Sequence, residues 1–184
     1  MERRCGIASL TCVGRIALTL LAAALCGSLP AQNSDETARL LASFNSHPKA
    51  DIAVELIKKY EGMHDRFDYP YYGYGHRRLP NENLSYDMTE EEAEALLRKD
   101  LAVRYKLFRR YGKDALLLTV LSFNVGQGGL LGHGGHPKSR LVRKLEAGNR
   151  DIYKEYISFR CWKGKPVHSI ERRRKMEFLL LYEP

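Results

Sequence analysis

The sequence contains little cysteine and little tryptophan. It holds four cysteines and one tryptophan in 184 residues, and Cys5, Cys12 and Cys26 all lie within the first 31 residues. If that segment is removed, Cys161 alone remains, which excludes an intrachain disulfide in the rest of the chain. The core must then be stable by packing alone. The 153 residues that follow suffice for one domain, because a domain of this size buries roughly 70% of its unfolded surface.

Long apolar runs are also lacking. The run Ile16–Leu25 has ten residues, which is too short to span a bilayer. Three arginines precede it, and small residues follow it as far as Ala31. This pattern predicts a secretory signal peptide over 1–31 and export to the periplasm or the extracellular space. A lipid anchor at Cys26 is the alternative, although Leu25 stands where lipoprotein signals generally carry a small residue.

Acidic residues are outnumbered by basic ones. The formal net charge is +8, and it falls to +6 without 1–31, which holds three arginines and one glutamate. A basic exported protein suggests an anionic partner, such as a cell-wall polymer, a membrane surface or a nucleic acid. No nucleic-acid-binding motif is recognised, so nucleic acid is not the expected partner.

The remaining sequence favours one mainly helical α+β domain over residues 51–184, with no internal repeats. Residues 32–50 are polar, and we expect a linker or a loosely docked arm there. The tyrosines, glycines and proline between residues 66 and 79 favour a small hairpin or twisted sheet. Apolar spacing predicts helices in the other segments, namely 51–60, 89–112, 114–126, 139–146, 151–159 and from 169 onward.

Several residues give the expected helix ends. Asp51, Thr89 and Asp114 are predicted N-caps, and Glu92 would complete a capping box with Thr89. The helix after Asp114 is apolar on almost every side, so it should be buried at the centre. We expect a glycine-rich loop over 128–135.

Five blocks then occur in a recognisable order. They are "IKKYEG", "GYGH", "ALLLTVLSFNVG", "SRLVRKLEAGN" and, after a Trp-bearing segment, "IERRRKMEF". Together they resemble the phage-type lysozymes, the endolysin muramidases, over residues 51–178. The resemblance implies a small N-terminal β-lobe and a larger helical lobe around a cleft. It also implies cleavage of the β-1,4 bond between N-acetylmuramic acid and N-acetylglucosamine in peptidoglycan glycan strands. We expect a monomer without cofactor or metal.

The resemblance assigns the catalytic acid to Glu61, the glutamate of "EG" at a helix end. A general acid must carry a proton at the working pH. A carboxyl at the end of an apolar helix face, facing a cleft wall, would be favoured in its neutral form. The other interpretation of Glu61 is a solvated helix-end carboxylate.

The sequence departs from the family after Glu61. Family members usually carry an Asp beyond this Glu and a Thr shortly before Gly-x-Gly-His, but here the stretch is shorter and contains no Thr. Tyr71 falls at the Thr position, and by the resemblance it is a further catalytic candidate. The Asp is either Asp65 or Asp68, and we prefer Asp68 because it would lie in the β element across from the helix end. Both could equally be ordinary turn carboxylates, and Glu61 alone would favour lytic transglycosylation over hydrolysis.

Other polar and aromatic residues are candidates for substrate binding. The resemblance places His76 near the cleft, paired with an acidic group. Tyr72 and Asn124 contact either the glycan or the core. Metal binding by the histidines of the glycine-rich loop is not expected. We read Trp162 as a core residue. A basic patch is expected at Lys163, Lys165, Arg172, Arg173, Arg174 and Lys175.

Two further functions stay open at this point. A catalytically inactive wall-binding module would explain the irregular Asp and Thr positions. A basic exported nucleic-acid binder is supported only by charge and tyrosines. The biological role is open as well, since wall remodelling, secretion or conjugation, and lysis all fit.

Overall fold

The structure is a computed structural model that describes residues 31–184, with side chains from residue 35 onward. The predicted signal peptide, apart from Ala31, and the alternative anchor at Cys26 lie outside the described residues. Within the described range, no helix is both long enough and apolar enough to cross a membrane.

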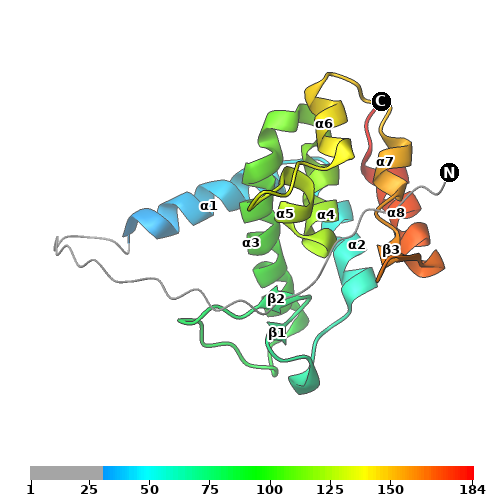
Figure 1. Ribbon diagram of the computed structural model, residues 1–184. Helices are drawn as coiled ribbons and strands as arrows, with labels where there is room; N and C mark the ends of the chain where they lie inside the picture. The colour runs from blue at the N-terminus through cyan, green and yellow to red at the C-terminus, as the bar shows by residue number, and fades with distance from the viewer. Residues whose placement is uncertain (1–30) are drawn as a thin grey trace.

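The described chain is mainly helical and carries two small antiparallel hairpins (Figure 1), which confirms the α+β class. The elements in chain order, with η for 3₁₀ turns, are α1 (Ala31–Asn45), α2 (Ala50–Glu61), η1 (Arg66–Asp68), β1 (Tyr71–Tyr72), β2 (His76–Arg77), α3 (Glu90–Phe108), η2 (Arg109–Asp114), α4 (Ala115–Val125), α5 (Gln127–Leu131), α6 (Arg140–Glu146), α7 (Tyr153–Ile157), β3 (Cys161–Trp162), β4 (Lys165–Pro166) and α8 (His168–Leu181).

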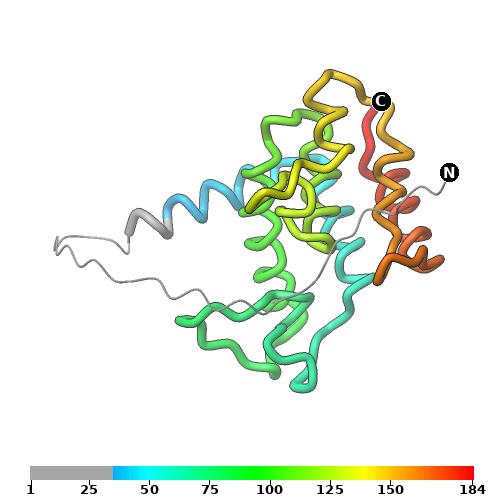
Figure 2. Tube along the Cα trace, viewed as in Figure 1, coloured from blue at the N-terminus to red at the C-terminus, as the bar shows by residue number. Residues whose placement is uncertain are grey.

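Helix α4 forms the centre of the core. Its residues from Ala115 to Ser122 are all buried, as expected for a helix that is apolar all round. Helices α2, α3, α5 and α8 pack against it. Helix α8 also packs against α2, although the two lie at opposite ends of the described chain (Figure 2). This return of α8 brings its side chains to the end of α2.

A short hairpin lies beside the N-terminal part of α3 (Figure 1). Tyr71 pairs with Arg77 and Tyr72 with His76, so the predicted small hairpin is confirmed. Residues 66–68 form η1 rather than extended chain. Asp68 therefore lies in a 3₁₀ turn and not in the β element where we expected it.

The segment 32–50 is not an extended linker. Residues 31–45 form the 15-residue helix α1, which packs along α3. Phe44 is fully buried, and its ring meets that of Tyr105 at a centroid distance of 6.1 Å. Polar residues cover most of the exposed side of α1. For this reason the sequence did not indicate that this segment packs against α3.

The predicted cap at Thr89 is confirmed. The Thr89 hydroxyl accepts from the backbone N–H of Glu92 at 3.2 Å, and the Glu92 carboxylate accepts from that of Thr89 at 2.8 Å. Ser139 similarly caps α6, accepting from Val142 N–H at 3.2 Å.

The predicted aspartate caps are wrong. The residue before α2 is Lys49, and Asp51 lies within the first turn, where it accepts from Arg98 at 2.8 Å. Asp114 does precede α4 but makes no cap bond. Its two carboxylate oxygens accept from Arg150 at 2.8 and 2.9 Å instead. Both aspartates thus bind an arginine that is distant in the sequence instead of a backbone N–H at the helix start.

Three expectations about the second half of the chain also change. The glycine-rich segment contains the short helix α5 before the bridge between His133 and His136. Trp162, read as core, is 53% exposed on β3. Cys161 is disulfide-bonded, whereas the expectation of no disulfide assumed the removal of residues 1–31.

Candidate active site

Glu61 is the last residue of α2. Ala53, Val54 and Ile57 bury the preceding face of this helix. Gly62 then ends the helix with φ 70°, a conformation that glycine adopts without steric cost. Glu61 thus follows a packed helix face directly, and its side chain keeps 22% of its exposure.

A buried arginine holds the Glu61 carboxylate. Arg173 on α8 donates from Nη1 to Glu61 Oε1 at 2.7 Å and from Nε to Glu177 Oε1 at 2.8 Å. The guanidinium also lies 5.2 Å from the ring centroid of Tyr60. Such charge-assisted bonds fix a carboxylate in orientation. The expected apolar wall is therefore replaced, on this side of Glu61, by a cation.

The next residue on α8, Arg174, extends this network into the core. Arg174 is fully buried; it donates to Glu177 Oε2 at 2.7 Å and to Asn124 Oδ1 at 2.8 Å. Tyr156 donates its hydroxyl to Glu177 at 2.8 Å. Burial lowers the pKa of Arg173, but Glu177 and Glu61 more than offset it, so the pKa lies above its usual value. Hydrogen bonds thus connect α2, α4, α7 and α8 around Glu61.

Sequence reasoning missed this network. The sequence places Arg173 and Arg174 in an expected basic patch, but both are buried, while Arg172 and Lys175 are exposed. A local signal was present, because Glu177 stands four residues after Arg173 and three after Arg174. That spacing places the three side chains on one helix face.

The chain that follows Glu61 is tied to the hairpin. The backbone N–H of His64 donates to Gly73 O at 2.8 Å, and His64 Nδ1 lies 3.1 Å from the same oxygen. The His64 ring lies 6.0 Å from that of Tyr71, which is partly exposed. These contacts hold β1 close to the segment that starts at the catalytic candidate.

The two candidate aspartates bind their own turn. Asp65 Oδ1 accepts from Phe67 N–H at 2.7 Å, and Asp68 Oδ2 accepts from Asp65 N–H at 3.0 Å. Both side chains are exposed. Within the described residues no hydrogen bond joins either carboxylate to Glu61.

His76 is paired with acidic groups, as the sequence predicted. Its Nδ1 lies 2.9 Å from Asp100 Oδ2, and its Nε2 lies 2.8 Å from Glu82 Oε2. The hydrogen bond to Asp100 raises the pKa of His76 to about 9, with help from Glu82 and against the effect of burial. A protonated imidazole donates to both carboxylates and clamps the hairpin to α3.

The tyrosines of the hairpin region differ in exposure. Tyr72 and Tyr74 are buried, while Tyr69 and Tyr71 are exposed. The Tyr72 ring stacks on Tyr86 with centroids 4.2 Å apart and planes at 13°. Tyr72 therefore packs within the hairpin region, and Tyr71 presents its ring to solvent.

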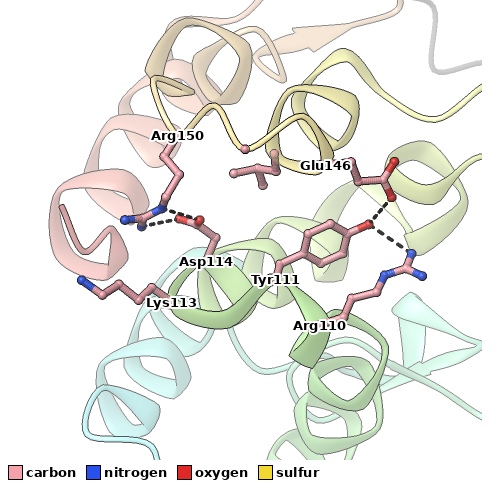
Figure 3. Close-up of a pocket in the computed structure, with 8 residues that line it drawn as sticks. Arg110, Tyr111, Lys113, Asp114, Glu146 and Arg150 are labelled. Carbon is pink, nitrogen blue, oxygen red and sulfur yellow. Dashed lines mark hydrogen bonds and ion pairs between the residues drawn. The ribbon is translucent and has the colours of Figure 1, made fainter.

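Glu61 lines neither of two pockets on the surface of the described chain. One, of about 620 Å³, lies between η2 and α6 (Figure 3). Within its lining, Arg150 binds Asp114 and the Tyr111 hydroxyl donates to Glu146. The other, of about 270 Å³, is bordered by side chains of α8 alone. The larger is lined by Arg110, Tyr111, Lys113, Asp114, Leu145, Glu146, Gly148 and Arg150.

Histidine and carboxylate side chains do not converge in a metal-binding arrangement in the described part of the chain. His133 and His136 come close, with ring centroids 5.6 Å apart, but a third ligand is absent from the described residues around them.

Comparison with known proteins gives one result. No curated protein matches the chain. The family model described as phage lysozyme matches residues 58–177, a range that begins three residues before Glu61 and ends at its indirect partner Glu177. It therefore spans the whole network around Arg173. The match covers well over half of the 184 residues, and the chain belongs to the phage lysozyme family.

Proposed function

We propose that this protein hydrolyses the β-1,4 bond between N-acetylmuramic acid and N-acetylglucosamine in peptidoglycan, with Glu61 as the general acid. Membership of the phage lysozyme family indicates a glycosidase that acts on peptidoglycan. The observation that carries the specific assignment is the bond from buried Arg173 to Glu61 at 2.7 Å. It holds a carboxyl group at the end of a packed helix, inside the range that matches the family.

The proposed reaction uses Glu61 as a proton donor. Its carboxyl gives a proton to the glycosidic oxygen while the bond from that oxygen to the anomeric carbon breaks. Water then adds its oxygen to the anomeric carbon and gives one proton to the carboxylate that activates it, and Glu61 regains its proton from solvent. Arg173 faces the carboxylate formed in between and stabilises its negative charge without reorganisation.

Asp68 is our candidate for activating that water, with Asp65 as the other choice. An inverting pair needs roughly 6.5–9.5 Å between its carboxyl groups. The alternative is lytic transglycosylation by Glu61 alone, in which the C6 hydroxyl of the muramyl residue attacks the anomeric carbon. The bonds that Asp65 and Asp68 make to their own turn favour this alternative. A wall-binding module without activity is the third possibility.

Substrate contacts are proposed for side chains around the hairpin and α4. Tyr71 presents an exposed ring on which a sugar face can stack. Asn124 uses its carbonyl oxygen for Arg174, which leaves its NH₂ group to donate to a substrate acetamide. Tyr72, through its ring stacking, and His76, through its hydrogen bonds, would hold the hairpin in position for substrate. The protein would act outside the cytoplasm as a monomer on glycan strands, and recovery of the protein from the cytoplasmic fraction would contradict this.

The proposal is tested by digesting purified peptidoglycan with the full chain and its Glu61→Gln variant, and identifying the products by mass spectrometry. We expect reducing-end muropeptides, lost by a factor of about 10² or more in the variant. Glu55→Gln is the matched control, because Glu55 lies on the same helix and is largely exposed. Its activity should equal that of the parent chain.

Product chemistry separates the alternatives. Anhydro-muropeptides that depend on Glu61 would establish a transglycosylase, and Asp68→Asn and Asp65→Asn would then both retain activity. A selective loss in Asp68→Asn would identify the second carboxylate of a hydrolase. Absence of products with the parent chain would overturn the enzymatic proposal and favour a wall-binding role.

A further inference from the structure

Arg104 on α3 is a partly buried guanidinium without a carboxylate. Within the described residues it makes no ion pair and no hydrogen bond, and its Nε is buried without a partner. By contrast, the partly buried Arg98 and Arg150 and the buried Arg173 each bind a carboxylate directly. A buried donor left without an acceptor costs free energy. This cost suggests that an acceptor arrives from outside the chain.

The position of Arg104 connects it to the candidate active site. Its Cζ lies 5.2 Å from the ring centroid of Phe123, the neighbour of Asn124 on α4. A methyl group at Gly75 would lie 3.4 Å from Cε1 of Phe123 and 3.9 Å from Cε1 of His64. Phe123 and His64 therefore converge on the hairpin turn, and His64 follows Glu61 by three residues. Arg104 and the hairpin turn thus share the Phe123 side chain as a neighbour.

The surroundings orient the guanidinium and provide no carboxylate that binds it directly within the described residues. The aromatic face of Phe123 attracts it electrostatically. Burial lowers the pKa of Arg104, and Asp100 one turn away only partly offsets this effect. Asp100 does not bind Arg104 directly among the described residues, and its carboxylate binds His76 at 2.9 Å instead. The planar fork of Arg104 is thus available for a carboxylate, which it can bind through two parallel hydrogen bonds.

We propose that Arg104 binds a carboxylate carried by the muramyl residue of the glycan strand. This inference rests on the proposed action on peptidoglycan and names the part of that substrate which the protein selects. The N-acetylated sugar backbone itself is uncharged. Its anionic groups are the lactyl carboxylate of a bare muramyl residue or, where a peptide is joined to the lactyl group by an amide bond, the carboxylates of that peptide.

The test measures binding by titration calorimetry with the Glu61→Gln chain, so that no ligand is consumed. Three soluble probes are compared: glycan fragments with peptides, fragments stripped to the free lactyl carboxylate, and N-acetylglucosamine oligomers. Adding Arg104→Gln should raise Kd at least about tenfold for a carboxylate-bearing probe, as for loss of one charge-assisted pair. It should leave Kd for the oligomers unchanged.

The choice of probe identifies the source of the carboxylate. A loss confined to peptide-bearing fragments assigns the contact to the peptide, and a loss confined to stripped fragments assigns it to the lactyl group. Arg104→Lys keeps the charge but not the fork, so it should recover part of the affinity. Arg110→Gln is the matched control, because this exposed guanidinium contacts only Tyr111 among the described residues.

Two results would overturn the inference. One is an equal Kd for all three probes with Arg104 and with its Gln replacement, in a chain whose thermal unfolding shows that it is folded. The other is a parent chain that binds none of the probes. Failure of the proposed function is distinguishable, because a chain that binds through Arg104 but releases no product from peptidoglycan would be a glycan binder without hydrolase activity.

Discussion

Arg173 determines the geometry around Glu61. Its guanidinium donates both to the half-buried carboxylate of Glu61 and to the buried carboxylate of Glu177. Replacing it with Ala leaves Glu177, which is fully buried, with one partner fewer. Removal of one member of a buried ion pair typically costs about 3–5 kcal/mol. We expect Arg173→Ala to lower the free energy of unfolding by that order, as measured by urea denaturation, and to reduce the proposed muramidase activity.

The control is the neighbouring Arg172→Ala, which truncates an exposed side chain of the same type. Its effect should stay within about 0.5 kcal/mol. Equal losses for the two variants would mean that the network around Glu177 does not stabilise the fold.

His76 makes stability depend on pH. Its folded pKa of about 9 exceeds the unfolded value of roughly 6.5. A group whose pKa is raised by folding stabilises fully below the unfolded pKa and loses that contribution as pH rises through the folded one. We therefore expect stability to fall between pH 6.5 and pH 9, by about 3 kcal/mol in total. Urea denaturation at pH 6, 7.5 and 9 measures the slope.

The comparison variant for this slope is His76→Asn, which cannot titrate. It should be less stable than the parent chain at pH 6 and show a flatter dependence between pH 6.5 and 9. A parallel decline in both chains would assign the pH dependence to other groups.

At the scale of the element, the capping box of α3 is a local device that can be tested alone. Thr89 and Glu92 satisfy each other's backbone N–H groups at the start of a 19-residue helix. Thr89→Ala removes the hydroxyl acceptor and should cost about 1 kcal/mol. Thr89→Ser keeps the acceptor and should cost only a few tenths of that. If the two substitutions cost the same in urea denaturation, the cap is not what stabilises this helix end.

The contrast between caps shows what sequence can predict about elements. Thr89 and Glu92 are three residues apart, so the pattern contains both partners and the prediction succeeded. Asp114 was predicted as an N-cap from its own residue type, but Arg150, which stands 36 residues further on, binds both of its oxygens. An arginine that donates two hydrogen bonds binds a carboxylate more strongly than a single backbone N–H does. Only the tertiary structure determines which arginine lies close enough to do so.

The candidate site follows the same rule. Glu61 could be named from the sequence because the resemblance marks it within a short motif. Its partner Arg173 lies 112 residues away, in a run of basic residues that composition alone assigns to the surface. The sequence also does not show that Arg104 lacks a carboxylate partner among the described residues. That lack depends on which carboxylates the other residues bind in the fold.

At the scale of the whole molecule, the core extends beyond the range that matches the family. The match begins at residue 58, yet α1 packs along α3 and buries Phe44 completely. The sequence suggested a domain boundary at residue 51 because α1 is polar on its outer side. We propose instead that α1 belongs to the folded unit, since a buried aromatic ring contributes several kcal/mol of stability.

Two phenylalanines test this boundary in the full chain. Phe44→Ala should lower the free energy of unfolding by about 3–5 kcal/mol, because it empties a buried site against Tyr105. Phe67→Ala removes the same side chain from η1, where it is 89% exposed, and should cost less than about 0.5 kcal/mol. A chain that begins at residue 51 should then lose at least as much stability as Phe44→Ala. If Phe44→Ala costs no more than Phe67→Ala, helix α1 is a loosely docked arm, and the family domain is stable without it.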